Sequence, residues 1–192
     1  WDANGRYVYF LASTNKALGS GWANTSSMSA KPSLAAYLMV LRKSDPSPFA
    51  FKSDEEPDST KDVKKTKDTS NAKAVVIDFD NLDRRTIALP SVPEGEYDQM
   101  LSGPKGTVFI IAGSSISKYN VDTKKMESFA NGNDVNVSAN GEKILFKSGE
   151  NWRVVSTNAA PSNPSQGIVA LNLQMQLSRL EEYKQILHEA WR

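Results

Sequence analysis

Few side chains in this sequence could do acid–base or nucleophilic chemistry. The chain has one histidine, His188, and no cysteine. A Ser-His-Asp mechanism needs a histidine that a carboxylate orients and that reaches a nucleophile. His188 stands between Leu187 and Glu189 in a helical pattern, and no serine can be assigned to it as a partner. We therefore expect no catalytic residue in this chain and place His188 on a helix surface or at an interface.

Metal and cofactor sites are not expected either. A lone histidine cannot build a multi-histidine site, and the lack of cysteine removes thiolate ligands. The turn Gly103-Pro104-Lys105-Gly106 lacks the Gly-Lys-Ser/Thr sequence of a phosphate-binding loop. The acidic stretch near residue 55 has no glycine to form the sharp turn of a calcium-binding loop.

The pair Arg84-Arg85 is the one candidate binding feature. A guanidinium group offers a two-pronged fork to a carboxylate, so the pair could anchor the carboxylate of a peptide. The alternative is a basic pair on a surface hairpin, which is commoner. Both interpretations stay open at this point.

Composition excludes some function classes. The 192 residues carry 23 basic and 22 acidic side chains, for a net charge of +1, so nothing favours nucleic acid as a partner. No apolar run approaches the roughly 18 residues of a membrane-spanning helix. The length suits one domain with a substantial core. The compartment is not fixed, and both periplasm and cytoplasm stay open.

A short phrase recurs along the chain and indicates a repeat architecture. A polar turn closes on a glycine, and an apolar strand follows, at Gly5, Gly106 and Gly141. The last two glycines are 35 residues apart, slightly less than the roughly 40–50 residues of a four-stranded propeller blade. The phrase predicts a mainly β fold: a partial β-propeller of about two to three four-stranded antiparallel blades, followed by a C-terminal α-helix.

Individual elements follow from local patterns. Residues 34–41 are apolar and could form a strand or a short helix. Two hairpins are expected, at residues 80–83 between strands 73–79 and 85–89, and at residues 122–124 between strands 118–121 and 126–129. Further strands are expected at residues 135–137, 143–147 and 152–156.

Three segments are expected along the chain. Residues 1–157 form the blades, with a charged low-complexity insertion at 53–72 that cannot bury enough apolar area to order itself. Residues 158–177 are a linker, in which the alternation of 168–173 could form a last strand. Residues 178–192 have helical periodicity, and Ser178 with Glu181 matches a capping box. Both ends of the chain are interpreted as cut from a longer protein.

Two sets of residues, far apart and in the same order, resemble tricorn-type serine peptidases. The helical set, Tyr183–Arg192, is similar to the helix that enters the protease core of that family. The other set resembles the second propeller and comprises Leu41–Phe49, Asp54–Glu56, Ile77–Asp80, Arg84-Arg85, Leu89-Pro90 and Gly95–Tyr97.

The resemblance implies that the chain is the last blades of that propeller plus the start of the core. It implies a parent serine-type peptidase that degrades peptides, with its catalytic residues in core segments outside this chain. Expected partners are peptide substrates, the remaining blades, the core of the same polypeptide and further copies of the parent in a homo-oligomer. The alternative is a stand-alone propeller of a periplasmic TolB-like kind that binds proteins, although such a module has no use for the terminal helix.

Overall fold

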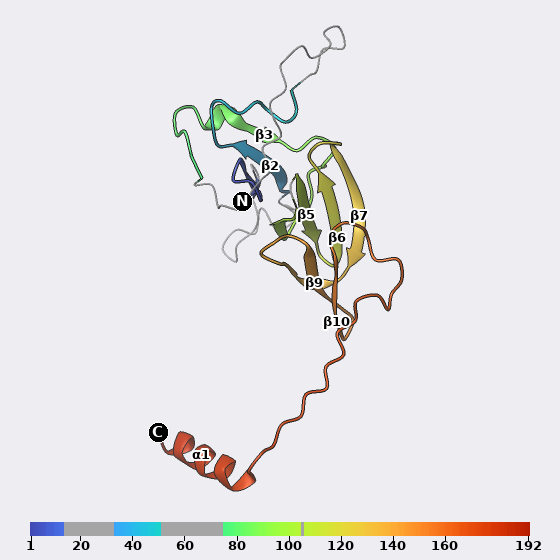
Figure 1. Cartoon of the computed structure of the whole chain (residues 1–192). Helices are drawn as coiled ribbons and strands as arrows, with labels where there is room; N and C mark the ends of the chain where they lie inside the picture. Colours follow the sequence, from blue (N-terminus) through green and yellow to red (C-terminus); the bar gives the residue numbers. More distant parts are fainter. Residues whose placement is uncertain (14–32, 51–74, 105) are drawn as a thin grey trace, which may run out of the picture.

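The computed structural model describes residues 1–13, 33–50, 75–104 and 106–192. Over these ranges the chain is mainly β, with three antiparallel sheets followed by one α-helix, α1 (Arg179–Trp191) (Figure 1). This architecture confirms the expected class of a β-rich chain with a C-terminal helix. The expected insertion at residues 53–72 lies outside the described residues.

The first sheet has the strand order β1 (Tyr7–Ala12), β2 (Ala35–Val40), β3 (Thr86–Ala88). Residues 34–41, which sequence left open between strand and helix, therefore contain a strand. The burial of β2 alternates, since Ala36, Leu38 and Val40 are buried and the residues between them are half-buried. That period of two is the signature of a strand with one face on a core.

The first expected hairpin is wrong. Residues 75–79 form no strand, and residues 80–83 turn into the 3₁₀ helix η3 (Asp83–Arg85). The backbone N–H of Asp78 donates to the carbonyl of Leu41, just past the end of β2, at 3.0 Å. Asn81 then adopts a φ of 53°, which reverses the chain. β3 consequently pairs with β2, and Phe79 is left 77% exposed.

The second sheet, here called the central sheet, has four strands in chain order: β4 (Gln99–Ser102), β5 (Thr107–Ala112), β6 (Ser115–Asn120) and β7 (Lys125–Asn131). The expected hairpin at residues 122–124 is confirmed between β6 and β7. The Asn120 side-chain oxygen accepts from the N–H groups of Asp122 and Thr123, both at 2.9 Å. This is the local bonding that makes asparagine a turn residue.

The third sheet contains β8 (Asn133–Val137), β9 (Lys143–Ser148) and β10 (Asn151–Ser156), in the order β10-β9-β8. The last strand expected at residues 168–173 does not form. Only Ile168 makes an isolated bridge, opposite Arg153. The Val154 N–H donates to the Gly167 carbonyl at 2.7 Å, and the Val169 N–H to that of Trp152 at 2.9 Å. The pairing stops there because β10 ends.

The glycine of the repeated phrase has the same backbone conformation in all three copies. Gly5, Gly106 and Gly141 have φ values of 62°, 70° and 73°, in the left-handed region that glycine adopts without strain. The first and third copies also share their bonds: Gly5 donates to the Asp2 carbonyl at 2.9 Å, and Gly141 to that of Ser138 at 2.8 Å. Each copy launches the strand that follows it, namely β1, β5 and β9.

The core is built on both faces of the central sheet. One cluster joins Val108, Ile110 and Tyr119 to side chains of the first sheet that include Tyr7, Leu38 and Val40. The other joins Phe109, Ile111, Ile116 and Phe129 to side chains of the third sheet that include Val135, Ile144, Phe146 and Val155. Successive residues of β5 point to opposite clusters, so the three sheets are stacked with the central sheet in the middle.

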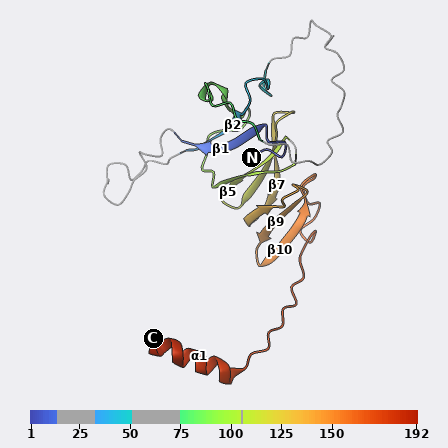
Figure 2. The same cartoon turned by 60° about the vertical axis from the view of Figure 1, so that its left-hand side comes forward.

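Helix α1 stands apart from the sheets (Figure 2). None of its residues is buried. Ser178 occupies the expected position before the first turn, but its side chain makes no capping bond, so the capping box is wrong. Its carbonyl instead accepts from the Glu182 N–H at 3.0 Å. Over the described ranges, no helix is long and apolar enough to cross a membrane.

The buried phenol of Tyr119 gives a test of this packing. Its hydroxyl has no partner among the described residues, and desolvation raises its pKa to about 12, against roughly 10 in an unfolded chain. Above about pH 10 the unfolded state therefore releases this proton first, and the free energy of unfolding falls as the pH rises toward 12. Tyr119→Phe is expected to change stability little at pH 7 and to reduce the alkaline loss, as measured by urea unfolding between pH 8 and 12. If the free energy of unfolding of the variant fell between pH 8 and 12 by as much as that of the unmutated chain, Tyr119 would lie outside the core.

Candidate functional site

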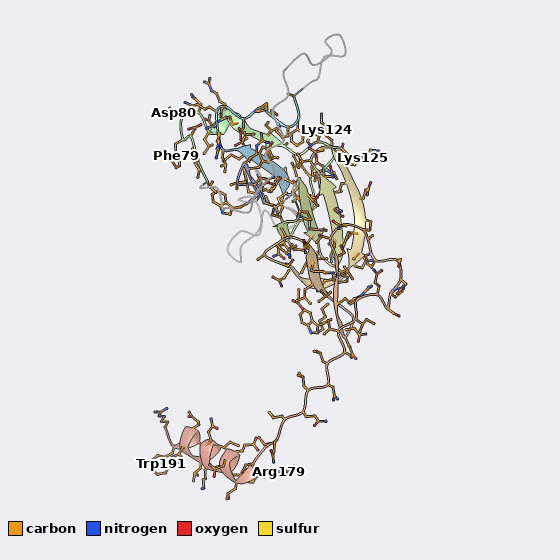
Figure 3. All side chains as sticks on the ribbon, viewed as in Figure 1. Phe79, Asp80, Lys124, Lys125, Arg179 and Trp191 are labelled. Carbon is orange, nitrogen blue, oxygen red and sulfur yellow. The ribbon has the colours of Figure 1, made fainter. Side chains whose placement is uncertain are left out.

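The two candidate anchor residues lie on η3, beyond the end of the first sheet. The segment before them is fixed to the loop after β2. The Lys43 N–H donates to the Asp78 carboxylate at 2.8 Å, and the Lys43 ammonium group lies 2.9 Å from the Asp80 carboxylate. Figure 3 shows Phe79 and Asp80 at this outer corner of the molecule, away from the β6–β7 turn at Lys124 and Lys125.

Arg85 uses its guanidinium group on its own chain. Nη1 donates to the Leu41 carbonyl at 3.0 Å, and Nη2 donates to the carbonyls of Asp78 and Asp80. Its Nε is buried and has no partner in the described part of the chain. Arg85 thus ties the 78–80 segment to the end of β2, and binding a peptide carboxylate would require it to release these carbonyls.

Arg84 is placed differently. Its side chain is exposed, and it makes no hydrogen bond or ion pair with any residue in the described ranges. Its fork is open to a carboxylate in solution. An exposed ion pair between Arg84 and such a carboxylate would contribute about 0.2–1 kcal/mol to binding, because water screens both charges. Of the two arginines, only Arg84 is therefore available as a peptide anchor.

His188 lies in the last turn of α1, exposed and remote from the sheets. No hydrogen bond joins it to a serine or carboxylate among the described residues. In the same residues, no group of three histidine or acidic side chains could hold a metal ion. Among the described residues, His188 therefore lacks the bonded nucleophile and orienting carboxylate of a Ser-His-Asp mechanism.

Sequence reasoning missed a buried arginine that fixes the path from the sheets to the helix. Arg153 is 6% exposed, and its Nε and Nη2 donate to the carbonyl of Gln166 at 2.9 and 2.8 Å. Nη2 also donates to the Asn163 carbonyl at 2.9 Å. The guanidinium carbon lies 5.3 Å from the centre of the Phe146 ring, a cation–π distance. The sequence did carry one signal for its burial. Alternate residues of a strand share a face, and Arg153 lies two residues before the buried Val155.

No family model, no curated protein and no solved structure matches this chain. The resemblance to tricorn-type peptidases is therefore carried by its residue motifs alone.

Arg84 and Arg85 form a matched pair for mutation. Arg85→Ala is expected to lower the free energy of unfolding by about 1–3 kcal/mol, because three carbonyl acceptors, two of them in part-buried bonds, lose their donor. Arg84→Ala is expected to change it by less than about 0.5 kcal/mol, as at most exposed positions. Urea unfolding of both variants measures the difference. Equal effects of the two changes would contradict the assignment of separate roles.

Proposed function

We propose that this chain is a non-catalytic propeller segment of a tricorn-like serine peptidase. In this proposal the three sheets are consecutive blades that guide peptides toward a core domain. The peptidase residues lie in that core, outside residues 1–192. The motifs at Leu41–Phe49 and Tyr183–Arg192 support the family, and the stacking of the sheets supports the blades.

The observation that carries the blade interpretation is that the stack still has apolar side chains on both outer faces. On the first sheet, Phe10 and Tyr37 are half-buried and their rings stack at 5.5 Å between centroids, on the face opposite the core. On the third sheet, Leu145 and Trp152 are half-buried and Val154 is 40% exposed, again on the face away from the core. Repeat units bury such faces against neighbouring units, as the central sheet does here.

The terminal helix favours this proposal over a stand-alone binding propeller. A closed propeller needs only strands, whereas α1 brings Leu180, Leu187 and Trp191 into solvent on a helix that touches no sheet. An element of that kind suits the start of a further domain. The remaining blades, the core and other copies of the parent are the partners that this arrangement calls for.

Peptide binding without cleavage tests the proposal. The purified chain is expected to bind a fluorescein-labelled, unstructured peptide weakly and to leave it intact. Arg84→Ala should weaken binding by up to about fivefold, because one exposed ion pair is lost. Amidation of the peptide's C-terminus should weaken its binding to the unmutated chain as much as Arg84→Ala does. The amidated peptide and the unmodified peptide should bind the Arg84→Ala variant with the same affinity. Fluorescence anisotropy gives the affinity, and chromatography of the peptide reports cleavage.

Arg179→Ala is the matched control, since Arg179 is an exposed arginine at the start of α1 and should leave binding unchanged. Two results would overturn the proposal. One is the absence of any peptide binding. The other is hydrolysis that disappears in His188→Ala, which would place a peptidase site inside this chain.

A further inference from the structure

The segment between the third sheet and α1 has the pattern of a strand but has no strand partner among the described residues. Leu171, Leu173, Met175 and Leu177 alternate with the amides Asn172, Gln174 and Gln176. Residues 170–178 lie outside the three sheets of the described residues and follow an extended path to α1 (Figure 1), and Leu173 is 86% exposed. We call residues 170–178 the ribbon segment. A free strand of this kind offers both an unpaired backbone and an apolar face.

The third sheet does not pair with the ribbon segment. The bridge between Arg153 and Ile168 sets an antiparallel register that places Ala170 opposite Asn151, the first residue of β10. Everything from Leu171 onward runs past the end of that strand.

We propose that the ribbon segments of two copies of this chain pair with each other, antiparallel, about a two-fold axis at Gln174. In that register Leu171 faces Leu177, Leu173 faces Met175 and Asn172 faces Gln176. The apolar side chains then share one face of the two-stranded ribbon, and the amides share the other. This symmetry lies in the sequence itself, because the apolar positions are placed equally on the two sides of Gln174.

Charge places no obstacle in the way of a second copy. Residues 168–178 contain no charged side chain. In residues 179–192, which comprise α1 and the Arg192 that follows it, three basic residues stand against three acidic ones: Arg179, Lys184 and Arg192 against Glu181, Glu182 and Glu189. Two ribbon segments can therefore pair without the repulsion that like charges cause across paired strands.

Two strands alone are marginal in water, so the dimer that the ribbon segments form is expected to be weak. Figure 3 shows α1 directly after the ribbon segment, from Arg179 to Trp191, with nothing packed on it. Leu180, Tyr183, Leu187 and Trp191 fall on one helix face and are all exposed, Trp191 by 91%. The proposed function assigns this helix face to a further domain, so the contact between two copies rests on the four apolar side chains of each ribbon segment.

A single introduced cysteine tests the register, because the natural chain has none. Antiparallel neighbours have Cα atoms about 4.5–5.5 Å apart, which a disulfide spans. Under mild oxidation the full chain carrying Gln174→Cys is expected to form a disulfide-linked dimer. Gln176→Cys is the matched control: its two copies would be displaced along the ribbon by about four residues, roughly 13 Å, and should stay monomeric on a denaturing gel. Asn172→Cys combined with Gln176→Cys should cross-link again.

The proposal also predicts a concentration-dependent dimer in analytical ultracentrifugation, weakened at least tenfold by Leu173→Asn and unchanged by Asn172→Ser. A monomer at all concentrations would overturn it. So would equal cross-linking of the Gln174→Cys and Gln176→Cys variants, which would mean parallel pairing or random contact. These experiments measure only contacts between ribbon segments, so their failure is distinguishable from failure of the peptide-binding experiment.

Discussion

The structure depends on the burial of both faces of the central sheet. Along β5, the residues from Thr107 to Ile111 are all buried, and successive side chains enter different clusters. A strand covered on both faces loses the polar alternation of a surface strand and becomes continuously apolar. The first and third sheets each contribute one face to the two clusters. β5 is therefore the strand that contributes buried side chains to both clusters, and removal of either outer sheet would expose half of them.

Sequence reasoning succeeded where one local cause decides the structure. A glycine needed at positive φ marks each of the three turns, and Asn120 closes the β6–β7 turn through its own side chain. It failed at residues 73–79, whose apolar run looks like any buried strand. The structure of the described part of that segment is decided by a distant main-chain bond, from Asp78 to Leu41, and no period in the sequence records it. The last strand failed for a similar reason, since β10 ends before the alternating segment does.

The candidate site shows the same division. Arg84 and Arg85 are adjacent, and sequence reasoning treated them as one basic pair. In a 3₁₀ turn, neighbouring side chains diverge by about 120°, so one arginine turns onto the carbonyls of residues 41, 78 and 80 while the other meets solvent. Composition cannot reveal which of the two is engaged. Arg153, by contrast, was predictable as an inward-facing residue, because it lies two residues from Val155 in the same strand. Its carbonyl partners were not predictable from the sequence.

Native-state hydrogen exchange tests the central role of β5 most directly. Amides that open only when the whole domain unfolds exchange with the free energy of global unfolding, whereas separately packed elements exchange by local opening. The account predicts that the amides of β5 are the slowest in the chain and match the global value, that those of β1 are less protected, and that those of α1 are close to unprotected. Amides of β1 or α1 that exchange as slowly as those of β5 would contradict it.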